Sequence, residues 1–140
     1  MHRLRFAALF VLIMLISSTV AACGPAGEPD IQLSSDHIDL GTVNNGQVEE
    51  FSVDVRNTGT APLIIEAVTT SCGCTSASVS PETIQPGQTG ALHVTYDSGA
   101  HGPEFSGEAE RQVFIASNDP DEREVIFDLA VNVIPEEGGS

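Results

Sequence analysis

The stretch Val125-Ile126-Phe127-Asp128-Leu129-Ala130-Val131-Asn132-Val133 decides the fold class of this 140-residue chain. Val125, Phe127, Leu129, Val131 and Val133 place a large apolar side chain at every second position. Because successive side chains of a β-strand point to opposite faces, this period of two predicts a long strand with one buried face. Phe51 to Arg56 and Leu92 to Tyr96 show the same alternation, and the second stretch places His93 on the solvent side.

The segments between these strands also favour an all-β fold. Turn residues recur every eight to fifteen positions from Ile31 to Val133, and no convincing helical period is present. Asn44-Asn45-Gly46 predicts a hairpin turn, because Asn and Gly tolerate positive φ. Leu63 to Val68 carries apolar residues on both faces, which suggests a central strand covered on two sides. Further strands are expected at Ile31 to Leu33 and His37 to Leu40, as two halves of one split strand, and at Val113 to Ala116.

Residues 31–134 are therefore expected to form a seven-stranded immunoglobulin-like β-sandwich. The hallmarks of antibody domains are missing, since the chain has no Trp and no two Cys spaced to bridge two sheets. The tail, residues 135–140, has nothing to bury and is expected to be disordered.

The first residues have the layout of an export signal. Two Arg in Met1 to Arg5 precede the apolar run Phe6 to Ile16, which is too short for a comfortable membrane span. Val20-Ala21-Ala22-Cys23 is similar to the bacterial lipobox, so residues 1–22 are expected to be a lipoprotein signal peptide and Cys23 the acylated residue. An uncleaved N-terminal helix and simple secretion with a free Cys23 are the alternatives.

Residues 23–30 then form the acylated Cys and a flexible tether rich in Pro and Gly. The protein is expected outside the cytoplasm, anchored to the cell membrane: the outer face of the inner membrane, or an outer membrane if there is one.

The composition excludes one class of partner. The chain has 5 Lys and Arg against 20 Asp and Glu, a formal net charge of −15. A field of this sign repels phosphate backbones, so nucleic-acid binding is not expected.

Several short motifs follow one another along the chain: Ile38-Asp39-Leu40-Gly41, Val55-Arg56-Asn57-Thr58-Gly59, Pro62-Leu63-Ile64-Ile65, Ser71-Cys72-Gly73-Cys74-Thr75, Ile84-Gln85-Pro86-Gly87, Val94-Thr95-Tyr96-Asp97 and Ser117-Asn118-Asp119-Pro120. Their order resembles the family called domain of unknown function 1573, a group with Hydin-like and major-sperm-protein-like sandwiches. The resemblance runs from about Ile31 to Val133 and implies a bacterial immunoglobulin-like domain, often exported or lipid-anchored, with no assigned reaction. The chain departs from the common pattern in its lack of Lys and in a long Asp97 to Glu110 loop.

Cys72-Gly73-Cys74 is the one feature with chemical potential. A disulfide across so short a loop would stabilise the fold by only about 1.6 kcal/mol. It would also need Gly73 to bend the chain, since same-side Cα atoms of an extended strand stand about 6.6 Å apart. A bridge of this kind would be easy to reduce, as a redox site requires.

Three interpretations of the pair stay open: structural pairing or packing, thiol redox exchange, and a site for a soft ion such as Cu(I). Zinc would need further ligands from His37, His93 and His101, which nothing in the sequence brings near Cys72. The absence of Lys and the negative field count against a reactive thiol. Asp119, Asp121 and Glu122 read as turn chemistry rather than as a calcium loop.

No catalytic constellation and no phosphate-binding loop appear, so no enzyme activity, resident metal or cofactor is expected. The predicted function is a non-enzymatic binding or structural module of the cell envelope, with an envelope protein or a glycan as partner. The alternative is a thiol-redox or Cu(I)-handling protein that uses Cys72 and Cys74.

Overall fold

The computed structural model describes residues 27–135 of the chain. The expected signal peptide (1–22), Cys23 and all of the expected tail except Pro135 lie outside the described residues.

The described chain is all-β, with nine strands where seven were expected. The two extra strands are Thr83–Ile84, which has only two residues, and Thr75–Ser80, which was not foreseen because its Ser and Thr residues resemble a loop. The strands are β1 (Ile31–Leu33), β2 (His37–Asn44), β3 (Val48–Asn57), β4 (Leu63–Thr70), β5 (Thr75–Ser80), β6 (Thr83–Ile84), β7 (Thr89–Asp97), β8 (Gly107–Ser117) and β9 (Glu124–Ile134).

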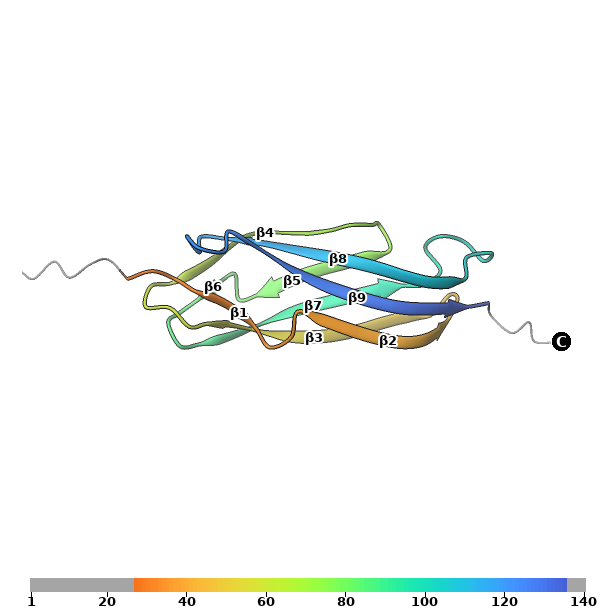
Figure 1. The fold of residues 1–140 in the computed structure, drawn as a ribbon, viewed down its shortest axis with the longest axis horizontal. Helices are drawn as coiled ribbons and strands as arrows, with labels where there is room; N and C mark the ends of the chain where they lie inside the picture. The colour runs from red at the N-terminus through yellow and green to blue at the C-terminus, as the bar shows by residue number, and fades with distance from the viewer. Residues whose placement is uncertain (1–26, 136–140) are drawn as a thin grey trace, which may run out of the picture.

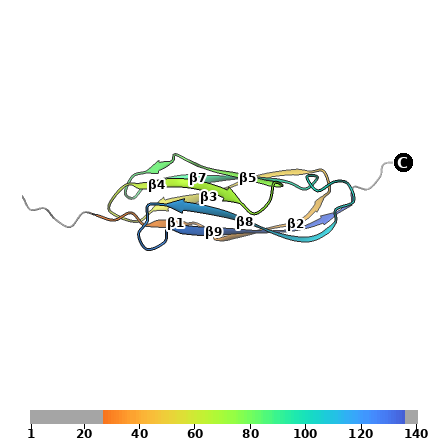
Figure 2. The same cartoon turned by 90° about the horizontal axis from the view of Figure 1, so that it is seen from above.

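These strands form two sheets packed face to face, as expected of an immunoglobulin-like sandwich (Figures 1 and 2). The first sheet has the order β1-β3-β7-β5, and the second has the order β2-β9-β8-β4-β6. All strand pairs are antiparallel except β2 with β9, which is parallel. The expected split of the first strand is confirmed, because β1 joins the first sheet and β2 joins the second.

The hairpin expected at Asn44-Asn45-Gly46 is wrong. The strands on either side, β2 and β3, belong to different sheets, so the turn carries the chain from one sheet to the other. Gly46 does have a positive φ of 89°, and the buried Asn45 amide donates to the carbonyl oxygens of Gly102 and Phe105. The turn signal reported the backbone conformation correctly, but it carried no information on which strands pair.

Two further expectations need correction. The strand β4 is covered on one face only, since Ile64 is 46% exposed and faces outward. The loop expected from Asp97 to Glu110 is shorter, because β7 includes Asp97 and β8 begins at Gly107, where pairing with β9 satisfies the backbone.

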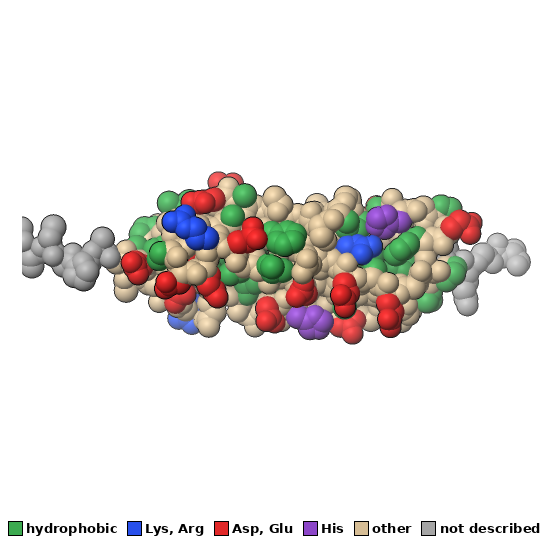
Figure 3. Space-filling view, turned by 45° about the horizontal axis from the view of Figure 1, so that its top comes forward, with side chains coloured by type: hydrophobic (Ala, Val, Ile, Leu, Met, Phe, Trp, Pro, Cys, Tyr) green, Lys and Arg blue, Asp and Glu red, His purple; other side chains and the backbone are tan. Residues whose placement is uncertain are grey.

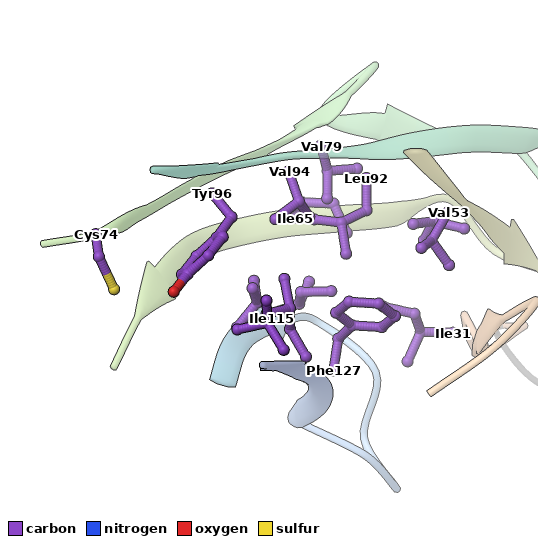
Figure 4. Packing of buried hydrophobic residues seen from close by; sticks show 14 of the residues in the cluster. Ile31, Val53, Ile65, Cys74, Val79, Leu92, Val94, Tyr96, Ile115 and Phe127 are labelled. Carbon is purple, nitrogen blue, oxygen red and sulfur yellow. The ribbon is translucent and has the colours of Figure 1, made fainter. Parts of the chain in front are cut away.

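The core lies between the two sheets and is built from the alternating residues of the long strands (Figure 4). Phe127 and Leu92 are fully buried, and the ring of Phe127 lies 5.9 Å from that of Phe51 on the opposite sheet. Burial of one such side chain contributes about 1.5–3 kcal/mol. The period of two in β9 is therefore what holds the second sheet against the first.

The described chain enters and leaves the sandwich at opposite ends of its long axis (Figure 1). At the entry end, Glu28 to Asp30 contact the turn between β3 and β4: the N–H groups of Thr58 and Thr60 donate to the carbonyl oxygens of Asp30 and Glu28, both at 2.8 Å. The turn between β4 and β5 lies toward the other end, beside the loop between β7 and β8 (Figure 1).

Candidate functional site: a disulfide turn beside Arg111

The turn between β4 and β5 contains a disulfide between Cys72 and Cys74, whose Cα atoms are 5.3 Å apart. This distance is shorter than the extended-strand spacing of about 6.6 Å, because the chain leaves the strand conformation after Thr70. The bend expected at Gly73 is present, and it brings the two sulfurs into the common range for a disulfide.

Two threonines and one glutamine hold the turn. Thr70 Oγ1 lies 3.0 Å from Cys72 O and 2.9 Å from Thr75 O, so one hydroxyl serves both sides of the turn. Thr75 Oγ1 lies 3.6 Å from Cys72 Sγ and 3.7 Å from Cys74 Sγ. The N–H of Gln112 donates to Ser71 Oγ, and the N–H of Ser71 donates to Gln112 O, both at 2.9 Å, which fixes the turn to β8. The disulfide is thus held in one place relative to both sheets.

Arg111 is the unexpected member of the site. It occupies a core-facing position of β8, where the neighbours two and four residues away, Ala109, Val113 and Ile115, are all buried. Arg111 Nε donates to Cys74 Sγ at 3.1 Å, and Nη1 donates to Glu110 O at 2.7 Å. A guanidinium in a row of apolar residues was visible in the sequence as a break in the alternation, although its sulfur partner was not.

His101 completes the cluster from the loop between β7 and β8. Arg111 Nη2 donates to His101 Nε2 at 3.4 Å, and the His101 ring lies 5.1 Å from that of Phe105. One ligand atom each of Cys72, Cys74 and His101 lie within 4.8 Å of one another. The sequence offered no reason to place a histidine here, because the loop that brings it is 27 residues away from Cys74 along the chain.

Tyr96 lies at the same end of the core. Its ring is fully buried, and its hydroxyl has no hydrogen-bond partner within residues 27–135. Burial raises the pKa of Tyr96, Arg111 opposes this increase, and Asp97 adds to it. Tyr96 is paired with Thr75 across the strands, and Figure 4 shows its hydroxyl and the Cys74 sulfur extending from the same sheet toward the interior.

The two sulfurs differ in environment. Cys74 is 3% exposed, whereas Cys72 is half-buried. Gly73 is exposed between them, and a Cβ added there would meet no atom within 4 Å. The arrangement suits exchange with an external thiol at the accessible sulfur. In the reduced form, the two thiolates and His101 would also offer a soft ion such as Cu(I) three ligands.

The remaining candidate residues do not join this cluster. His37 lies on the edge strand β2, and His93 Nδ1 is 3.0 Å from Ser52 Oγ on the outer face of the first sheet. Asp119 has its carboxylate engaged by the backbone: Oδ1 accepts from the N–H groups of Asp121 and Glu122, at 2.9 and 3.1 Å. This is the turn chemistry that the sequence predicted.

A two-sheet sandwich with a strand divided between the sheets defines the class: the described residues form an immunoglobulin-like β-sandwich. Residues 31–133 match the profile of the family described as Protein of unknown function (DUF1573), and the chain belongs to this family. The resemblance expected from the motif order is therefore confirmed. A search of the curated proteins finds no match.

Solved structures share the fold at low sequence identity. A protein of unknown function from Porphyromonas gingivalis W83 aligns with a TM-score of 0.66 and 21% identity, over 81% of this chain and 51% of that one. The PapD-like domain 7 of human CEP192 aligns with a TM-score of 0.59 and 13% identity, over 87% of this chain and 97% of that one. The YadV chaperone aligns with a TM-score of 0.54 and 16% identity, over 79% of this chain and 55% of that one. The chain thus spans about half the length of the Porphyromonas protein.

Within the described residues, no helix is long and apolar enough to cross a membrane.

Proposed function

We propose that this protein is an exported, lipid-anchored module of the bacterial cell envelope that binds an extended segment of another protein along strand β5. The role is non-enzymatic. The observation that carries the proposal is β5 itself, an edge strand of six residues without a charged side chain and without a register shift against β7.

The other edges carry features that disfavour pairing. β1 and β6 cover only parts of their neighbours, but the uncovered stretches of β3 and β4 carry the charged residues Glu49, Glu50 and Glu66. β1 has three residues and β6 has two, too few to pair with a partner strand. β2 is longer, but its register shifts between Asp39 and Thr42, and an irregularity of this kind disfavours further pairing. β5 has six residues, Thr-Ser-Ala-Ser-Val-Ser, with no charge and no register shift against β7. An edge of this kind is a ready template for an added strand.

The backbone of β5 is oriented for such an addition. The N–H of Asp97 donates to Cys74 O at 2.8 Å, which sets the alternation of the ladder between β7 and β5. By this alternation Ser76, Ser78 and Ser80 direct their N–H and C=O groups toward β7, and Ala77 and Val79 direct theirs to the open edge. A partner strand would satisfy the groups of Ala77 and Val79.

The charge of the surface favours a basic partner segment. Acidic side chains are spread along the face in Figure 3, with few basic ones between them, and the formal net charge of the chain is −15. Electrostatic complementarity raises the association rate of oppositely charged partners. We therefore infer a segment with β-forming residues flanked by Lys or Arg.

The sequence supports the location. Arg3, Arg5, the apolar run from Phe6 and the lipobox-like end at Cys23 have the order of a lipoprotein signal. A disulfide between Cys72 and Cys74 is consistent with an oxidising exported compartment. The described chain begins at one end of the sandwich, so an anchor there would leave the opposite end, with the disulfide turn, facing away from the membrane (Figure 1).

The docking proposal is tested with a display library of random twelve-residue peptides selected on the full chain. Selected peptides should protect the amide hydrogens of Ala77 and Val79 from exchange, and their affinity should decrease with added salt. Ala77→Pro, which removes an outward N–H, should abolish binding, whereas the matched control Ala77→Thr should retain it. A failure to select any peptide, or protection confined to other strands, would show the proposal to be wrong.

A second candidate function is thiol–disulfide exchange at Cys72 and Cys74, and one specific observation favours it. Of the three hydrogen bonds of Arg111, none goes to a carboxylate, although the chain has 20 Asp and Glu, and one goes to Cys74 Sγ. A cation at this position stabilises a thiolate, which answers the objection that no Lys stands near the pair. The function is tested by the equilibrium of the oxidised chain with glutathione, which should lie well within the measurable range rather than fully toward the disulfide.

A further inference from the structure

The exchange proposed as the second candidate function has, we infer, a fixed polarity: an incoming thiolate attacks Cys72 Sγ, and Cys74 Sγ leaves as a thiolate held by Arg111. This inference rests on that second function. It assigns Cys72 as the attacked residue, Cys74 as the leaving group and Arg111 as the group that stabilises the leaving sulfur.

Access to the two sulfurs is the first argument. An attacking thiolate must reach one sulfur of the disulfide along the direction of the S–S bond, so the exposed sulfur is favoured. Cys72 is half-buried beside the exposed Gly73, whereas Cys74 is 3% exposed. The open space around Gly73 leaves room for the chain that carries the attacking thiol.

Stabilisation of the leaving group is the second argument, and it is independent of access. The sulfur that leaves gains a negative charge, and a thiol of lower pKa leaves faster. Arg111 Nε already donates to Cys74 Sγ at 3.1 Å, and no hydrogen bond from Arg111 reaches Cys72. The guanidinium is held in place by Glu110 O and His101 Nε2, so little reorganisation is needed when the charge appears.

The first step balances without any additional reactant. The thiolate of a partner forms a bond to Cys72 Sγ, the bond between Cys72 and Cys74 breaks, and its electron pair remains on Cys74 Sγ. In the second step, a second thiolate of the same partner attacks the partner's sulfur that is bound to Cys72, and Cys72 Sγ leaves. The partner dithiol is oxidised to a disulfide, and the Cys72–Cys74 disulfide is reduced by two electrons.

The partner is therefore a protein dithiol, or a protein disulfide when the reaction runs in reverse. The position of the turn agrees with this class, because the turn lies directly before β5, the edge strand proposed to dock an extended segment. A partner chain paired with β5 would have its neighbouring residues beside Cys72.

The polarity is tested by mapping the mixed disulfide. The oxidised full chain, purified in detergent, is mixed with reduced glutathione, quenched in acid, treated with N-ethylmaleimide and digested for mass spectrometry. Glutathione should be found on Cys72 and N-ethylmaleimide on Cys74, at a ratio of at least about ten to one. Equal labelling, or glutathione on Cys74, would overturn the polarity while leaving the exchange function intact. No exchange at all would overturn both.

The role of Arg111 is tested by its variants. In Cys72→Ser, the thiolate absorbance of Cys74 at 240 nm is followed against pH, and addition of Arg111→Gln should raise the titration midpoint by about one pH unit or more. In the chain with both Cys, Arg111→Gln should slow the first exchange step by about threefold to tenfold. Arg111→Lys should restore part of both effects, and Arg56→Gln, a charge-matched change on the exposed face of β3, should alter neither.

Circular dichroism and the thermal midpoint show whether Arg111→Gln retains the fold, and the Arg111→Lys rescue separates a charge effect from a packing effect. If a folded Arg111→Gln variant left both the titration midpoint of the Cys74 thiol and the exchange rate unchanged, the assignment of Arg111 would be overturned. The reduced chain is also offered Cu(I): uptake of one ion that resists competition by glutathione would overturn exchange in favour of a copper site at Cys72, Cys74 and His101.

Discussion

Asp119 Oδ2 accepts a hydrogen bond from the backbone N–H of Ile31 at 2.9 Å, so the turn between β8 and β9 in one sheet holds the first strand of the other. The two residues are 88 positions apart in the chain. Both are buried, and the other carboxylate oxygen of Asp119 holds its own turn. One side chain therefore joins the two sheets at the end where the described chain begins.

We expect Asp119→Ala to destabilise the fold by about 2–3 kcal/mol, because it leaves buried N–H groups without a charged acceptor. The measurement is the free energy of unfolding from urea titration. Asp121→Ala, an exposed residue of the same turn, is the matched control and should change stability by less than about 0.5 kcal/mol. Equal effects of the two variants would contradict the role of Asp119.

The same carboxylate should make stability depend on pH. Burial alone would raise the pKa of Asp119, but the N–H donors of Ile31, Glu122 and Asp121 outweigh it, so the folded pKa lies below the ordinary value of 3.8. The folded state thus binds the proton more weakly than the unfolded chain, and the stabilisation is complete above the unfolded pKa and lost as pH falls through the folded pKa. The stability difference between the wild type and Asp119→Asn should be constant from pH 7 to about 5 and shrink below about 4. Urea titrations of both proteins across this range provide the check.

Tyr96→Phe should leave stability at neutral pH unchanged or raise it by up to about 1 kcal/mol, because it removes a buried hydroxyl that has no partner in residues 27–135. At high pH the free energies of unfolding of the wild type and of Tyr96→Phe should diverge. The folded pKa lies above the ordinary 10.0, so the wild type loses stability as pH rises from there, and Tyr96→Phe does not. Tyr96 is the one Tyr in a chain without Trp, so absorbance at 295 nm reports its ionisation directly. A titration midpoint at or below 10.0 would be the contrary result.

Conversion of both Cys72 and Cys74 to Ser should cost only about 1.6 kcal/mol of stability, since the loop that the disulfide closes is so short. The oxidised and reduced wild type should differ by a similar amount in urea titration. A loss of more than about 4 kcal/mol would far exceed what so short a loop provides and would favour a structural disulfide over an exchange site.

Cys23→Ala should release the protein from membranes if Cys23 carries the lipid. The measurement is partition into the detergent phase of Triton X-114, where the wild type should be found and the variant should not, with Cys72→Ser as a control that keeps the anchor. Acyl chains contribute about 0.8 kcal/mol per buried methylene, so the contrast should be large. Partition of Cys23→Ala into the detergent phase would contradict the anchoring.

Much of the fold could be predicted from local patterns. The alternation in β9, β3 and β7 specified strands with one buried face, because the period of two is a property of any extended chain. β5 escaped prediction because Val79 is its one large apolar residue, and its place in the fold comes from pairing with β7. The turn at Asn45 and Gly46 was visible as a turn, but its direction between the sheets depends on distant pairing partners.

The sequence by itself determined the fold class, the acidic surface and the presence of two neighbouring sulfurs, since each of these depends on residues close together in the chain or on composition alone. Only the tertiary structure decided that the sulfurs differ, one half-buried and the other 3% exposed against Arg111. Arg111 and Cys74 are 37 residues apart, and they meet because β4 pairs with β8 and the chain turns beyond Thr70. No local pattern encodes this contact, because the register between distant strands is set by the packing of the whole core.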